Sequence, residues 1–297
     1  MQKKKYSIIG IGLCGSQIIE GLDNRIKEQV YTTLIIESQD TRIDQNSIAD
    51  ENIVIETNFL KDQVNYIYNL MQSNDYTFFL FVGNLSEKFT FQVIQNYTSN
   101  NFFNDSLTIG LFSMPYTFEG SRIAQNAFNR LQIINGLLDT TIPYFESKFK
   151  NKFLNIDESF SIRVEHGVLL CSELLNALIH IPNGRVRIFF PDFNLIFQSG
   201  KLCSFSTGTA EGASRSRLAT SHAISKLFNN FKSKKSIGEV LLNITANEEE
   251  ITMTEILEIT KSIENSHFGS NLIWTLTDEK ENKGLRVSLF LTNLEMN

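Results

Sequence analysis

Proline, cysteine and basic charge are scarce in this 297-residue chain, and each scarcity excludes a class of protein. Four prolines and sixteen glycines exclude a collagen-like or linker-dominated chain. The three cysteines, Cys14, Cys171 and Cys203, are far apart and form no C-x-x-C pair, which fits a reducing cytosol and excludes a zinc site built on cysteine pairs. A net charge of −6 argues against nonspecific nucleic-acid binding, which needs basic patches.

Long apolar runs are missing as well. No uninterrupted run reaches the ~18–20 residues that a membrane span requires, and the basic N-terminus enters a strand without a signal-type apolar core. We therefore expect a cytoplasmic protein that is not an integral membrane protein and does not bind nucleic acid. Its composition, with 42% hydrophobic residues, 20% charged residues and 24 phenylalanines, is that of a globular protein with one large or two ordinary domains.

The stretch Tyr6–Leu22 organises the first half of the chain. Its apolar strand enters a glycine turn that opens an amphipathic helix, and Gly10, Gly12 and Gly15 fit the pattern G-x-G-x-x-G. Such glycines let the backbone approach a phosphate, to which the helix N-terminus offers unpaired N–H groups. The pattern indicates a nucleotide-binding turn, and a merely tight strand-to-helix turn is the alternative.

Strands and helices alternate through the first half. The apolar runs that predict strands are Tyr31–Ile36, Asn52–Ile55, Tyr76–Val82, Leu107–Ser113 and Asp139–Pro143. Helices are predicted around Leu60–Met71, Phe89–Tyr97 and Phe118–Leu138. This order implies a mostly parallel sheet.

The second half begins with a long, largely apolar helix predicted over Ser159–Ile181. Four further strands, predicted to complete a small mixed sheet, are Lys201–Thr209, Val240–Ala246, Asn271–Thr277 and Leu285–Thr292. Three helices are predicted among them, at Asp192–Phe197, Glu211–Phe231 and Thr254–Glu264.

Five segments resemble the tubulin/FtsZ superfamily, and bacterial FtsZ in particular. Gly212–Ile224 is similar to the FtsZ segment G-x-x-R-x-x-x-A-x-x-x-A-I, and Gly238–Ala246 is similar to its strand G-x-L-V-N-I-T. Leu285–Val287 stands where FtsZ has its last strand, and Pro115–Gly120 resembles its K-P-F-x-F-E-G turn. Gly12–Ile18 is closer to the tubulin loop G-Q-C-G-N-Q-I. The matches follow the family order over most of the chain.

The resemblance implies an α/β fold in three parts. These are a Rossmann-like, GTPase-type parallel-sheet domain at residues 1–158, a long central helix with its connection at 159–184, and a smaller α/β activation-type domain at 185–297. It also implies head-to-tail filaments, formed with itself or with another FtsZ-like protein, and contact with a membrane adaptor. Because the sequence ends soon after its last predicted strand, we expect any membrane contact at a surface other than the terminal peptide that FtsZ uses.

Residues that would face GTP or GDP also follow from the resemblance. The first loop, which would contact the phosphates and base, contributes Gly10, Gly12, Cys14, Gly15, Ser16 and Gln17. Glu119 matches the family's ribose-contacting glutamate, and the guanine-reading Asn/Asp pair aligns with Glu165 and His166. Ordinary helical roles are the alternative for these last two. No His/Asp/Glu cluster has metal-ligand spacing, so no metal site is expected.

Two departures from the family concern the phosphates. The glycine-rich loop expected after Tyr76–Val82 is replaced by Gly83–Phe89, which keeps one glycine and places Glu87 near the expected phosphate. Like charges in a partly desolvated site repel strongly. The loop that senses the γ-phosphate is absent between Ile55 and Leu60. Both departures predict weak binding of GTP or GDP.

A third departure concerns hydrolysis. Of the two aspartates that polarise the attacking water in FtsZ, only Asp192 remains, and Phe189 stands at the other position. Phosphoryl transfer depends on positioning and charge stabilisation, so we expect hydrolysis to be lost. Asp192 is then a vestigial catalytic residue or simply a helix N-cap.

The sequence leaves three alternative functions open. The first is a divergent FtsZ/tubulin-like cytoskeletal or scaffold protein that self-assembles or assists membrane remodelling or cell organisation. The second is an active GTPase of the same superfamily, in which Ser86 and Lys88 serve as an unorthodox phosphate loop. The third is an NAD-binding Rossmann oxidoreductase, in which Glu37 at the end of a strand holds the ribose. A polar strand end explains Glu37 equally well.

Overall fold

The computed structural model describes residues 5–28, 30, 32–38, 51–55, 76–98, 106–144, 156–199, 202–230, 239–247, 251–266, 271–279 and 284–294. The chain divides into two compact units, Met1–Ser172 and Glu173–Asn297. The division falls inside the long helix α6 (Ile156–His180). The helix predicted at Leu60–Met71 lies outside the described residues, and the division at 1–158, 159–184 and 185–297 stays a prediction.

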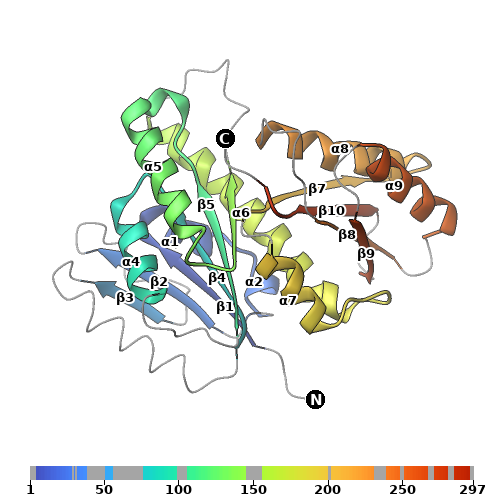
Figure 1. Ribbon diagram of the computed structural model, residues 1–297, viewed down its shortest axis with the longest axis horizontal. Coiled ribbons are helices and arrows are strands. Elements are labelled where there is room, and N and C mark those ends of the chain that lie inside the picture. Colours follow the sequence, from blue (N-terminus) through green and yellow to red (C-terminus); the bar gives the residue numbers. More distant parts are fainter. Residues whose placement is uncertain are drawn as a thin grey trace. The chain divides into compact units, whose positions relative to one another are not determined.

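The first unit contains a six-stranded sheet with every described strand pair parallel (Figure 1). Its strand order is β3-β2-β1-β4-β5-β6. The strands are β1 (Lys5–Ile11), β2 (Thr32–Ser38), β3 (Glu51–Ile55), β4 (Tyr76–Asn84), β5 (Leu107–Ser113) and β6 (Thr140–Tyr144). The connecting helices are α1 (Gly12–Glu20), α2 (Asn24–Lys27), α4 (Lys88–Thr98) and α5 (Ser121–Ile134). The predicted α/β fold with a parallel sheet is confirmed.

The two central strands, β1 and β4, are apolar because both of their faces are covered. Ile8, Ile9 and the run Phe78–Val82 are fully or almost fully buried. Continuous apolar runs are typical of parallel strands covered by helices on both faces. The Phe81 ring packs edge-on against Tyr97 of α4, with ring centroids 6.3 Å apart.

The helix predicted at Phe118–Leu138 is interrupted in the structure. A short turn, η2 (Thr117–Glu119), precedes α5, which begins at Ser121 and ends at Ile134. The Tyr116 N–H donates to Glu119 Oε1 at 2.8 Å, so the glutamate closes its own turn before the helix starts. The sequence pattern missed this bond because Phe118 and the residues after it keep helical spacing across the turn.

The second unit contains a smaller mixed sheet in the order β7-β10-β8-β9 (Figure 1). Its strands are β7 (Ser204–Ala210), β8 (Glu239–Ala246), β9 (Asn271–Asp278) and β10 (Leu285–Leu291). β10 runs antiparallel to β7 and β8, whereas β8 and β9 are parallel. The small mixed sheet predicted from the sequence is confirmed.

Helices α8 (Arg215–Asn230) and α9 (Met253–Asn265) pack on one face of this sheet (Figure 1). Ala219 and Ala223 of α8 are fully buried in the same core cluster as Ile259 of α9. The start of α9 is a capping box, in which the Glu255 N–H donates to Thr252 Oγ1 at 3.3 Å and the Thr252 N–H donates back to Glu255 at 2.9 Å.

Helix α6 and its continuation to Asn183 form the one stretch within the described residues that is long and apolar enough to cross a membrane. Its mean hydropathy is 1.3, but 44% of the most apolar window is buried in the structure. The core helix of a globular protein passes the same test, so length and composition alone do not identify a span.

Candidate functional site

The N-terminus of α1 lacks a local cap. Ile11 occupies the cap position without a side-chain hydrogen bond, and the first turn of α1 contains no acidic residue. The first N–H groups of a helix have no partner inside the helix and attract negative charge. A side chain from elsewhere in the chain, water or a ligand can satisfy them.

Glu87, just before α4, brings a carboxyl group to this position. A Cβ built on Gly12 would lie 2.1 Å from Glu87 Oε2, and Gly12 has φ +70°, so only glycine fits this turn with the carboxyl group so close. Burial raises the pKa of Glu87 to about 7, against the lowering effect of the Arg163 charge and of hydrogen bonds from the Cys14 N–H and the Thr90 hydroxyl. We call Glu87, Gly12, Cys14, Thr90 and Arg163 the Glu87 cluster.

Arg163 of α6 is the cation of this cluster. Its side chain is buried and forms an ion pair with Glu119, and its guanidinium lies 4.5 Å from the centre of the Tyr116 ring. Glu119 also accepts the Tyr116 N–H. The carboxylate predicted to contact a ribose is thus already paired within the first unit.

Other first-loop residues have structural roles. The Ser16 hydroxyl donates to the Gly12 carbonyl oxygen at 2.8 Å. A Cβ on Gly15 would lie 2.3 Å from the Val82 carbonyl oxygen, and one on Gly10 would lie 2.6 Å from the Gly15 carbonyl oxygen. The glycines at 10 and 15 therefore let α1 pack directly on β1 and β4. Gln17, which follows Ser16, is half-buried.

Cys14 is buried beside polar side chains of β5 and β6. Its Sγ lies 3.8 Å from Ser113 Oγ, and burial raises the pKa of the thiol to about 12. A neutral thiol of this kind is a poor nucleophile and a poor metal ligand. His166, one turn after Arg163 on α6, places its ring edge-on to Tyr144 with centroids 5.6 Å apart. Glu165 is exposed.

Asp192 lies in the second unit, where it is exposed in the first turn of helix α7 (Phe190–Ser199). It lines a groove of about 640 Å³ together with Arg187, Ile188, Phe189, Leu195, Ile196, Glu239, Ile273 and Trp274. Phe189 and Leu195 are 67% and 61% exposed, although both are large and apolar. We call this feature the α7 groove.

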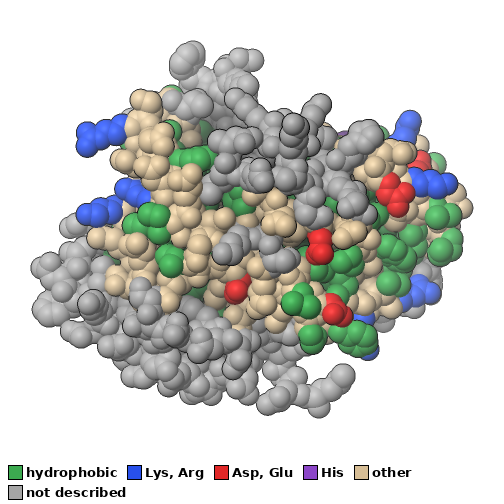
Figure 2. Space-filling view, in the orientation of Figure 1, with side chains coloured by type: hydrophobic (Ala, Val, Ile, Leu, Met, Phe, Trp, Pro, Cys, Tyr) green, Lys and Arg blue, Asp and Glu red, His purple; other side chains and the backbone are tan. Residues whose placement is uncertain are grey.

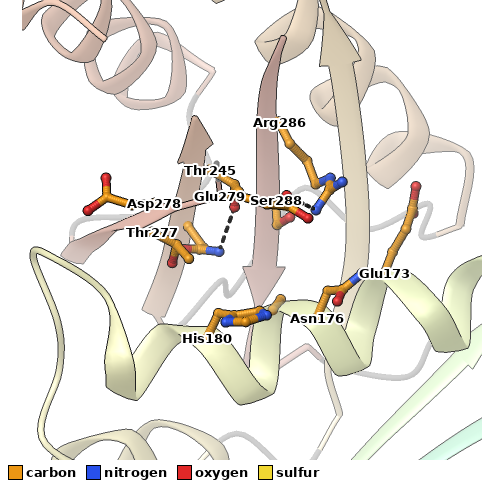
Figure 3. A pocket seen from close by; sticks show the side chains of 11 residues that line it. Glu173, Asn176, His180, Thr245, Thr277, Asp278, Glu279, Arg286 and Ser288 are labelled. Carbon is orange, nitrogen blue, oxygen red and sulfur yellow. Dashed lines mark hydrogen bonds and ion pairs between the residues drawn. The ribbon is translucent and has the colours of Figure 1, made fainter. Parts of the chain in front are cut away.

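A second, smaller pocket of the same unit is polar (Figure 3). Glu173, Asn176 and His180 of α6 point toward Thr245, Thr277 and Ser288 of the sheet, and Arg286 forms an ion pair with Glu279 at 3.1 Å. The cavity measures about 10 Å³, which is room for a single water molecule. It is too small for a nucleotide.

Arg163 links the predicted site residues: its charge acts on Glu87, which accepts the Cys14 N–H of the first loop, and it forms an ion pair with Glu119. Sequence reasoning missed Arg163, Tyr116 and Tyr144. A usable signal existed for Arg163, which is the only lysine or arginine in the 25 residues of α6. Glu37 has no described side chain, and Asp192 lies in the other unit.

Comparison with known proteins finds relatives of one kind. The chain is 26% identical over 208 residues to the cell division protein FtsZ of Porphyromonas gingivalis, covering 64% of this chain and 42% of that protein. It is also 26% identical over 191 residues to FtsZ of Magnetospirillum gryphiswaldense, covering 63% and 34%. These likenesses support a divergent protein of the FtsZ/tubulin superfamily. No family model matches it.

Solved structures agree with this FtsZ/tubulin fold. A mutant FtsZ of M. jannaschii superposes with a TM-score of 0.78 at 18% identity, covering 98% of this chain and 92% of that one. CetZ2 from Haloferax volcanii, in a GTPgS-bound protofilament, gives 0.78 at 13% identity, covering 98% and 93%. The chain spans less than half the length of the two curated FtsZ relatives.

Proposed function

We propose that this FtsZ-like chain is a self-assembling cytoskeletal or scaffold protein in which GTP or GDP binding is weakened and hydrolysis is lost. The observation that supports the proposal is the Glu87 carboxyl group at the N-terminus of α1. The resemblance implies that the nucleotide phosphates would lie at this turn. An ionised Glu87 repels a phosphate at this turn, and the protonated carboxyl group still fills the space beside Gly12.

Hydrolysis is proposed to be lost for a separate reason. Asp192 is exposed at the start of α7, and the position of the other family aspartate is taken by Phe189. An aromatic ring cannot polarise a water molecule, and a carboxylate in the first turn of a helix is a common structural choice.

The α7 groove is proposed as an assembly surface. Large exposed apolar side chains gathered in one concave region mark protein contacts more often than isolated ones do. Figure 2 shows hydrophobic side chains gathered over α7 and the neighbouring part of the second sheet, with acidic side chains among them. We propose that copies of this chain, or this chain and another FtsZ-like protein, associate head to tail through it in the cytoplasm, where a membrane adaptor could recruit the filament.

The test is assembly with and without nucleotide. We expect sedimentation and negative-stain electron microscopy to show the same assembled fraction with GTP, with GDP, with NAD and without nucleotide. Asp192→Ala is expected to leave phosphate release unchanged. Rapid GTP-dependent assembly and turnover would contradict the proposal and favour an active GTPase that uses Ser86 and Lys88.

A pair of variants tests the surface within the same experiment. Phe189→Ser removes a 67% exposed apolar side chain from the α7 groove, and we expect it to lower the assembled fraction severalfold. Met253→Ser is the matched control, because Met253 is equally exposed at 67% but lies on α9 outside the groove. An equal loss of assembled fraction in both variants would contradict the proposal that the α7 groove is the assembly surface.

A further inference from the structure

We propose that Glu87 is a built-in competitor of phosphate, whose carboxyl group occupies the position at the α1 N-terminus that the pyrophosphate of a nucleoside diphosphate would take. This inference rests on the proposed function, since it explains how nucleotide binding is weakened. It adds that the site for the anion is intact beneath Glu87 and can be reopened by one substitution.

The first support is that the carboxyl group substitutes for a helix cap. α1 has no cap of its own, and the Cys14 N–H in its first turn hydrogen bonds to Glu87. Gly12 provides the space, because any Cβ there would overlap Glu87 Oε2. Glu87 thus makes the interactions by which a helix N-terminus holds an external anion.

The second support is an unused donor in the same cluster. Arg163 is 6% exposed, and its Nε has no hydrogen-bond partner within the described part of the chain. A buried guanidinium N–H without a partner is costly, and arginine is well suited to phosphate oxygens. The charge of Arg163 acts on both Glu87 and Cys14, so the guanidinium lies within electrostatic range of the first turn of α1.

Removing the Glu87 carboxylate would therefore leave a site that lacks its anion. It would consist of the free N–H groups of α1 and the Arg163 guanidinium, with space beside Gly12 for an oxygen of the ligand. This chemistry suits the pyrophosphate of a nucleoside diphosphate rather than its base or ribose, because Glu119 is already paired with Arg163.

Isothermal titration of the full chain at pH 8 with inorganic pyrophosphate and, separately, with GDP tests the inference. We expect Glu87→Ala to bind both ligands at least tenfold more tightly than the wild type. Glu87→Gln removes the charge but keeps the volume, so a smaller gain is expected. Glu28→Ala, which removes an exposed carboxylate of the same unit, is the matched control and is expected to show no gain.

Absence of a gain in folded Glu87→Ala, or an equal gain in the Glu28→Ala control, would overturn the inference. Should Glu87→Ala not fold, Glu87→Gln decides alone: a gain supports the inference and no gain overturns it. These results differ from a failure of the proposed function, which would appear as tight GDP binding by the wild type itself and would overturn both.

Discussion

Raising the pH from 5 to 8 is expected to lower the free energy of unfolding through Glu87 by about 2–3 kcal/mol. Burial raises the folded pKa of Glu87 from 4.5 to about 7, so the folded state binds the proton more tightly than the unfolded state. This stabilising effect is fully present below pH 4.5 and is lost as the pH rises to 7. Glu87→Gln cannot lose a proton, and its stability should lack this decline.

Urea unfolding of the wild type and Glu87→Gln at several pH values measures the effect. The comparison is needed because burial lowers the pKa of His180, which makes stability rise with pH up to about 6.5 in both proteins. Cys14 does not titrate in this range, since its pKa is about 12. Parallel pH profiles for the two proteins would show that Glu87 is not buried beside Gly12.

Gly15→Ala is expected to lower the free energy of unfolding by about 3 kcal/mol with no nucleotide present. The added Cβ would lie 2.3 Å from the Val82 carbonyl oxygen and 3.0 Å from the Gly10 carbonyl carbon. Both contacts involve backbone atoms, one of them in the central strand β4, so neither can move aside cheaply. Thermal or denaturant unfolding monitored by circular dichroism measures the change.

Gly136→Ala is the matched control for this substitution. Gly136 is exposed after α5, and its added Cβ would lie 3.4 Å from the nearest atom, the Ile133 carbonyl oxygen. A change within about 1 kcal/mol is expected there. Similar small effects at both positions would mean that the spacing of Gly10 and Gly15 serves something other than helix packing.

Much of the fold follows from the sequence because the spacing of apolar residues reflects which side chains are buried in each strand or helix. The run Tyr76–Val82 predicted the buried strand β4, and the apolar run Val240–Ala246 predicted the buried strand β8. The interruption before α5 was missed because it depends on one side-chain hydrogen bond, from the Tyr116 N–H to Glu119.

The candidate site was predictable only in part. The glycine turn is visible as residue types at fixed spacing, and the resemblance to FtsZ implied that Glu87 would lie near the phosphates. Arg163 lies 76 residues after Glu87, and only the packing of α6 within the first unit brings the two charges together. The resemblance therefore indicated a carboxylate near a phosphate position, but not its burial or its cation.

The claim that Glu87 weakens nucleotide binding is tested by the guanine nucleotide content of the purified wild-type chain. The chain would be isolated without added nucleotide and denatured, and the released nucleotides would be separated by anion-exchange chromatography. Because Glu87 occupies the N-terminus of α1, we expect far less than one bound GDP or GTP molecule per chain. One tightly bound guanine nucleotide per chain would contradict it.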